Sequence, residues 1–109
     1  KTDVENIDNA LALVEQLRGV SFDWIEMNAG KHDFGFIAEE VAKVLPELVK
    51  VEDGEAIGVA YHRLTAITVE AIKAQQDQIE SLTTERDDLQ SRIERLEALV
   101  GALIENGGE

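Results

Sequence analysis

The sequence predicts an α+β fold in which a small head of short helices and strands precedes a long C-terminal helix that forms a parallel coiled coil. In the first part of the chain, short helix-like and strand-like patterns alternate between turn residues. Between Gly58 and Gly101 the chain has neither Gly nor Pro, and apolar residues recur there with a period near 3.5. We therefore expect a head at residues 1–61 and a stalk at residues 62–109.

The first element expected in the head is a helix of roughly three turns. Its apolar residues recur at helical spacing: Ile7, Leu11, Val14 and Leu17. Asn6 or Asp8 is a candidate to cap its start, and Gly19 follows the last periodic residue.

Two short strands joined by a turn follow this helix. The first is predicted by alternating apolar residues: Val20, Phe22 and Trp24. The second holds Phe34 and Phe36 on either side of Gly35, where a glycine indicates a close backbone approach or a bulge. The turn is expected at residues 28–31. We expect these aromatic side chains in the core of the head rather than around a ligand.

A helix and a hairpin complete the head. The helix is expected from Ile37 to Leu45, because Pro46 ends it. A hairpin with a four-residue loop, Glu52–Glu55, is expected next. Its strands are marked by four apolar residues: Val49, Val51, Ile57 and Val59. Tyr61 is expected to open the long helix and to pack on this hairpin.

The long helix is expected from about His62 to about Glu105, since its residue types favour helix. With Ile72 at heptad position a, the a positions are Ile72, Ile79, Arg86, Ile93 and Val100. The d positions are Gln75, Leu82, Leu89, Leu96 and Leu103. We expect all of these residues except Gln75 at an interface between chains, because a lone helix would leave such a stripe in water.

Charge and side-chain shape bear on the geometry of this interface. Arg92 at position g would face Glu97 at position e of a neighbouring chain, which favours parallel helices. Ile at a and Leu at d favour two strands, whereas Leu99 at g widens the apolar stripe and suits three. Arg86 at a would fix the register at some cost in stability. The heptads leave dimer and trimer open, and a less favoured alternative packs the helix back on its own head.

Composition restricts the function classes. The net charge of −13 repels nucleic acid and anionic membranes, so neither is expected as a partner. No run approaches the roughly 20 apolar residues of a membrane span. The chain has no cysteine, and a head this small is marginal alone, so we expect self-association to stabilise it. The opening lacks Met and a signal-peptide pattern, which suggests an excised or processed fragment.

The polar residues predict neither a cofactor nor a metal site. His32 and His62 lie far apart in sequence, so roles in a turn and at a helix start are favoured over metal binding. Glu39 and Glu40 are neighbours that point in different directions on a helix, and we expect both to be solvated. The sequence brings no nucleophile and base together, so an enzyme acting in trans finds no support.

Five stretches in order resemble the peptidase S74 family, the intramolecular chaperone domains at the C-termini of phage endosialidases, tail spikes, neck appendages and tail fibres. They are LRGVSFDW (17–24), GFIAEEV (35–41), LPELV (45–49), VAYHRL (59–64) and EAIK (70–73). Gly19 stands where the family often has Pro. The resemblance extends from Lys1 to about Leu96.

The resemblance implies a homotrimer that aligns an upstream β-rich fibre or spike domain of the same polypeptide during folding and is then released by self-cleavage. In the family the cut precedes a Ser nucleophile, assisted by a Lys five residues later. Lys1 matches that Lys, whereas the Ser and Asp of the motif are missing, so this fragment is expected to be inactive. The implied location is the host cytoplasm during virion assembly, with the parent protein in the virion tail.

Two other functions remain as alternatives. A permanent trimerisation foot would never be cleaved, and a receptor-binding tip would carry an exposed aromatic or apolar patch on the head. A eukaryotic membrane-tethered transcription factor also carries a domain of this kind, so the resemblance does not by itself require a phage.

Overall fold

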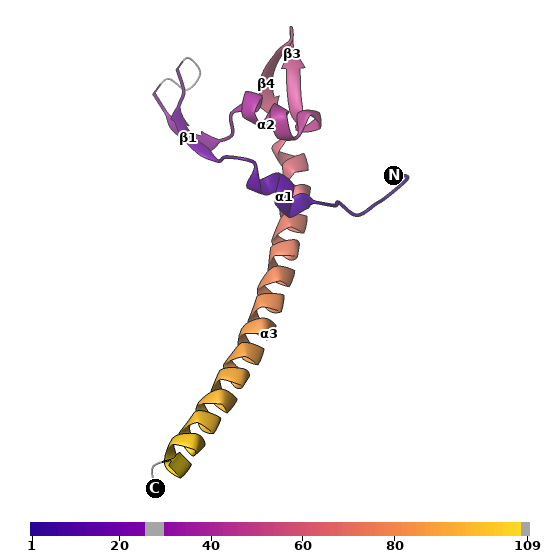
Figure 1. The fold of residues 1–109 in the computed structure, drawn as a ribbon. Helices are drawn as coiled ribbons and strands as arrows, with labels where there is room; N and C mark the ends of the chain where they lie inside the picture. Colours follow the sequence, from indigo (N-terminus) through magenta and orange to yellow (C-terminus); the bar gives the residue numbers. More distant parts are fainter. Residues whose placement is uncertain (26–29, 108–109) are drawn as a thin grey trace. The chain divides into compact units, whose positions relative to one another are not determined.

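The computed structural model describes residues 1–25 and 30–107. Short helices and strands come first and one long helix, α3, comes last, which confirms the α+β class and the long C-terminal helix (Figure 1). The chain divides into two compact units, Lys1–Ala74 and Gln75–Glu109. The first turns of α3 therefore belong to the N-terminal unit.

Helix α1 is shorter than expected, at Ala10–Glu15. Asn9 occupies its N-cap position in the left-handed conformation, with φ of 59° and no side-chain cap. That conformation interrupts a right-handed helical path, so the expected start was wrong and neither Asn6 nor Asp8 caps the helix. The helix also ends well before Gly19.

Strands β1 (Val20–Asp23) and β2 (His32–Gly35) form the first expected hairpin as an antiparallel pair. Strand β2 ends at Gly35, so Phe36, which was expected in this strand, lies just after it. The Trp24 N–H donates to the Lys31 carbonyl over 3.0 Å and extends the pairing past β1. The first half of the turn expected at residues 28–31 lies outside the described residues.

Helix α2 (Ala38–Val44) confirms the second expected helix. Pro46 ends it and also opens a short 3-10 helix, η1 (Pro46–Leu48), because a proline is tolerated in a first turn. The Ala60 N–H donates to the Leu48 carbonyl over 2.7 Å, which joins η1 to the start of α3.

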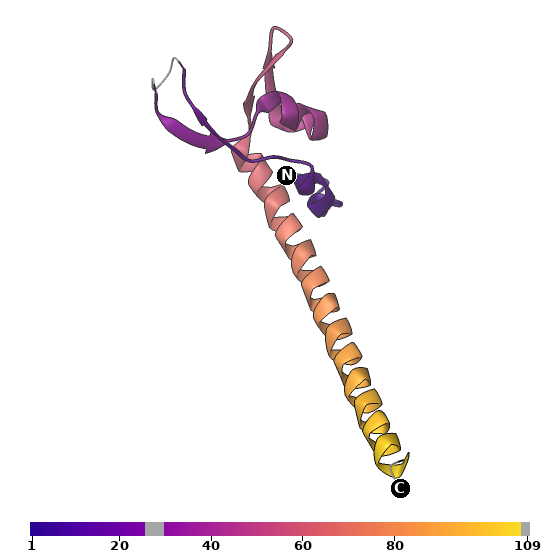
Figure 2. The same ribbon diagram turned by 60° about the vertical axis from the view of Figure 1, so that its left-hand side comes forward.

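Strands β3 (Val49–Glu52) and β4 (Glu55–Val59) form the second hairpin. Its loop has two residues rather than four, because Asp53 and Gly54 both take positive φ, at 50° and 79°. Lys50 pairs with Gly58 and Val51 with Ala56, so Ile57 is the extra residue of a β-bulge. Figure 2 shows the two hairpins as separate two-stranded ribbons.

The buried core of the N-terminal unit is aliphatic. It consists of Ala10, Val41, Leu45, Leu48, Leu64, Ile67 and Ala71. The expected aromatic core holds only for Phe36, which is partly buried against this cluster. Phe22 is partly buried elsewhere, and Phe34 is 75% exposed. Short aliphatic side chains from α1, the α2–η1 segment and α3 fill the core, whereas the rings of Phe22 and Phe34 lie outside it.

Helix α3 runs from Tyr61 to Gly107. Its first turns contribute Leu64, Ile67 and Ala71 to the core, which explains why they belong to the N-terminal unit. From Gln75 onward every described side chain of α3 is exposed.

Candidate functional site

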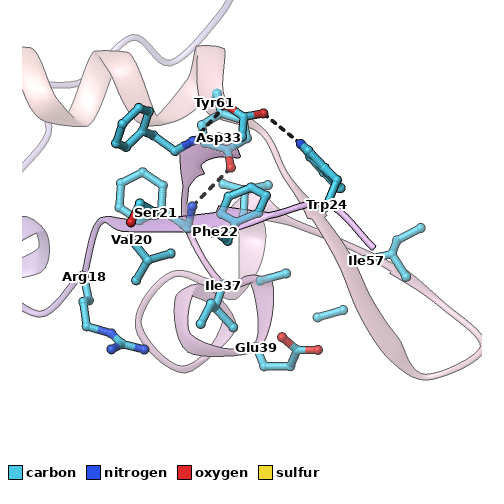
Figure 3. Close-up of a pocket in the computed structure, with 16 residues that line it drawn as sticks. Arg18, Val20, Ser21, Phe22, Trp24, Asp33, Ile37, Glu39, Ile57 and Tyr61 are labelled. Carbon is cyan, nitrogen blue, oxygen red and sulfur yellow. Dashed lines mark hydrogen bonds between the residues drawn. The ribbon is translucent and has the colours of Figure 1, made fainter. Parts of the chain in front are cut away.

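A cavity of about 710 Å³ lies between the two hairpins of the N-terminal unit (Figure 3). We call it the head groove. Three segments line it, within residues 18–24, 33–39 and 56–61. They bring together β1, β2, the first turn of α2 and residues 56–59 of β4.

The head groove presents apolar side chains to solvent. Phe34 is 75% exposed, Ile57 is 49% exposed, and Trp24 and Ile37 are exposed to lesser extents. Ile57 lies at the bulge of β4, where a bulge re-aims a side chain. The Trp24 ring packs edge-on against Phe22, with ring centroids 5.0 Å apart. The aromatic residues therefore form a surface, as the receptor-tip alternative requires.

A carboxylate is fixed at the edge of this surface. Asp33 accepts a hydrogen bond from the Phe34 N–H over 2.8 Å and another from the Trp24 indole N–H over 3.0 Å. These donors lower the pKa of Asp33 below its usual range, since they favour the charged carboxylate. Across the hairpin, His32 Nδ1 lies 2.8 Å from Asp23 Oδ1.

The histidines take the positions that were favoured for them. His32 lies on β2 beside the hairpin turn, and His62 is exposed in the first turn of α3. Among the described residues, no group of three or more His, Asp or Glu side chains is arranged to hold a metal ion.

Tyr61 lines the head groove where α3 begins. Its hydroxyl accepts a hydrogen bond from the Phe36 N–H over 3.3 Å, and its ring centroid lies 6.0 Å from that of Phe36. A Cβ added at Gly35 would lie 2.7 Å from the Tyr61 hydroxyl oxygen. Gly35 thus marks a close approach, as expected, and Tyr61 packs at the end of β2.

Arg18 and Glu40 form a bidentate ion pair between the segment before β1 and helix α2. Arg18 Nε lies 3.0 Å from Glu40 Oε1, and Arg18 Nη2 lies 2.6 Å from Glu40 Oε2. The hydrogen bonds lower the pKa of Glu40 and raise the pKa of Arg18. The expectation that Glu40 is merely solvated was wrong, whereas Glu39 is exposed beside the groove.

The second candidate surface is the seam of α3, which we define as the residues expected at the interface. Its apolar members range from 50% exposed at Ile79 to 70% at Leu103. Arg86, the charged member, lies with its Nη2 3.1 Å from Oδ1 of Asp87 in its own chain. The described chain therefore leaves the whole stripe accessible.

Lys1, the expected cleavage residue, is exposed and does not line the head groove. All four aromatic residues that sequence reasoning weighed as the lining of a ligand pocket, and then assigned to the core, line the groove: Phe22, Trp24, Phe34 and Phe36. Gly35 was a further signal, because it marked a close approach without identifying the partner.

Residues 1–50 match the family model Peptidase_S74, described as chaperone of endosialidase. This match covers 50 of the 109 residues and supports the suspected family. The matched segment holds α1, the first hairpin, α2 and η1, and so most of the head groove. The seam of α3 lies outside the match. No curated protein matches the chain. In the described part of the chain, no helix combines the length and apolarity that crossing a membrane requires.

Proposed function

We propose that this peptidase S74 chain is an intramolecular chaperone that forms a homotrimer and aligns an upstream β-rich phage fibre or spike domain of its own polypeptide. The family match supports the chaperone role. The exposed seam of α3 supports the assembly, and it is the observation on which the proposal mainly rests.

The seam argues for association because its apolar side chains remain in water in a single chain. Burying a Leu or Ile side chain contributes about 1.5–3 kcal/mol, and the seam repeats such residues over more than four heptads. The apolar stripe widens near the C-terminus, where Leu99 and Ile104 are 62% and 69% exposed. A wider stripe favours three helices over two.

Trimerisation suits the folding of a β-rich fibre. Strands from different chains pair slowly, and a slip of one residue turns side chains to the wrong face. A stalk that assembles first raises the effective concentration of the upstream segments and aligns their starts.

The head groove is the surface we propose for contact with the upstream domain. Its exposed Phe34, Ile57 and Trp24 suit apolar segments of an unfinished fibre, and Asp33 and Glu39 add polar groups at its rim. The same patch favours the alternative of a receptor-binding tip. Phe34→Ser in the parent protein distinguishes the two: a chaperone contact predicts less folded fibre, whereas a tip predicts normal fibre with weaker receptor binding.

Release by self-cleavage at the N-terminal edge is the last part of the proposal. A lysine acts as a base only when its amine is neutral, which burial or nearby positive charge promotes. Lys1 is exposed in the structure, so its activation would come from the residues that precede it in the parent protein. In the parent, we expect mass spectrometry to find the cut upstream of Lys1, and Lys1→Ala to abolish it. An uncleaved wild-type parent would favour the permanent foot.

The chaperone role is tested by a seam variant in the parent protein. Leu89→Asp places a charge at position d and should prevent trimerisation, so the fibre domain should aggregate. The matched control, Ser91→Asp, adds the same charge at an outer position and should leave folding unchanged. Soluble trimeric fibre from the Leu89→Asp parent would refute the role.

A further inference from the structure

The outer positions of the seam contain a charge pattern that only one register satisfies. In parallel, in-register helices, each g residue faces the e residue five places later in the neighbouring chain. The four pairs are Gln78–Thr83, Glu85–Gln90, Arg92–Glu97 and Leu99–Ile104. None places like charges together, one is an ion pair, and the last buries apolar against apolar.

A shift of one heptad destroys this pattern. It places Glu85 of one chain against Glu97 of another, and it leaves Arg92 facing Ile104. Like charges across a helix interface are destabilising, and a desolvated arginine without a partner costs more. The shifted pairing therefore loses interactions on both sides of the seam.

Arg86 adds a stronger constraint, since it lies at position a among apolar residues. In the single chain its guanidinium hydrogen-bonds to Asp87, at the outward-facing position b, over 3.1 and 3.3 Å. Both side chains are well exposed, at 70% and 63%. Burying the Arg86 guanidinium at position a while its counter-ion remains outside is costly, so the seam favours another acceptor.

Glu85 supplies that acceptor from a second copy. A residue at position a packs beside the g residue that precedes it by one place in the neighbouring chain, which here is Glu85. Within one chain, adjacent helical residues do not face each other, so Glu85 and Arg86 cannot satisfy one another. In the described part of the chain, Glu85 takes part in no ion pair.

We propose that the seam binds copies of this same chain in one register only, and that the Glu85–Arg86 layer fixes it. On assembly, Arg86 exchanges Asp87 of its own chain for Glu85 of the neighbouring copy. The layer then has equal numbers of positive and negative groups. A shift of one heptad buries Arg86 against Ile79 or Ile93. This inference rests on the proposed function and deepens it, because a chaperone that aligns three upstream segments requires a fixed register.

A double-mutant cycle on the 109-residue chain tests the contact between Glu85 and Arg86. Glu85→Arg and Arg86→Glu should each weaken assembly, measured by sedimentation equilibrium across a dilution series. The double variant, which restores opposite charges, should recover at least about fivefold of the association constant relative to the product of the single effects. Additive effects would overturn the inference.

The register itself is read by cross-linking, because the chain has no cysteine of its own. A Gln75→Cys chain mixed with a tagged Leu82→Cys chain reports a one-heptad shift through a mixed disulfide. We expect only same-position disulfides in the wild-type background. Arg86→Ile should strengthen assembly and allow the mixed disulfide. Mixed disulfides in the wild-type background would contradict the proposal.

The two proposals fail in different ways. A wild-type chain that stays monomeric refutes trimerisation itself. A wild-type trimer with an additive cycle refutes only the register layer.

Discussion

At the scale of the residue, Gly35 lies at a close approach that a single added carbon would disturb. We predict that Gly35→Ala destabilises the chain by about 1–3 kcal/mol, because its Cβ would meet the Tyr61 hydroxyl oxygen at 2.7 Å. Urea unfolding followed by circular dichroism measures the loss. Gly19→Ala is the matched control, since a Cβ there has no heavy atom within 4 Å. Equal effects at the two glycines would contradict the close approach.

The Arg18–Glu40 pair predicts an acid-dependent stability. The folded chain lowers the pKa of Glu40, so the pair stabilises the fold above the ordinary glutamate pKa of about 4.3. The contribution is lost as the pH falls through the lowered pKa, because protonation removes the charge that Arg18 binds.

Two variants isolate this effect in urea titrations repeated from neutral to acidic pH. Glu40→Gln should remove part of the acid dependence, whereas its exposed neighbour Glu39→Gln should retain it. An unchanged acid dependence in Glu40→Gln would mean that the ion pair does not form.

These residues show what a sequence reveals at this scale. Gly35 was identifiable because a glycine between two aromatic residues of an expected strand indicates a close backbone approach or a bulge. The Arg18–Glu40 pair was not, because its partners lie 22 residues apart and only the packing of α2 against the preceding segment brings them together. The same holds for Trp24 and Asp33, whose contact depends on the pairing of β1 with β2.

At the scale of the element, helix α2 holds the centre of the core. Val41 is 1% exposed, so Val41→Ala should destabilise the chain by about 2 kcal/mol, from lost burial and the cavity left behind. Val51→Ala, at a position 58% exposed on β3, should change stability by much less. Chemical denaturation at a fixed chain concentration compares them. A similar loss for both would mean that α2 is not the centre of the core.

The elements were predictable where one strong local signal decides them. Pro46 predicted the end of α2, and the run without Gly or Pro predicted the long helix α3. Helix α1 was overestimated because Ile7 continues the apolar spacing, whereas the left-handed backbone at Asn9 leaves no trace in that spacing. The second hairpin was predicted correctly, but its loop was predicted as four residues. The dipeptide Asp53-Gly54 is by itself a signal for a two-residue turn, and that signal was overlooked.

At the scale of the whole molecule, the stability of the chain should depend on its concentration. Anything that binds the folded state raises the apparent stability, and here the ligand is another copy of the chain. The melting temperature should rise with chain concentration, followed by circular dichroism at 222 nm. In Leu96→Asp the rise should disappear, whereas in Ser91→Asp it should persist. A concentration-independent wild-type melting temperature would argue against self-association.

The head groove marks the limit of prediction at this scale. Heptads can be counted along one helix, so the seam was defined from sequence alone. A groove built from three segments and a bulge requires the tertiary arrangement. The aromatic residues that line it were assigned to the core because the chain has so few aromatics.

The solution mass of the 109-residue chain tests the central claim most directly. Sedimentation equilibrium across a dilution series should give three times the 12.0 kDa chain mass at high concentration, dissociating in a single step on dilution. A chain that remains monomeric at high concentration, or that stops at a dimer, would contradict the trimeric chaperone.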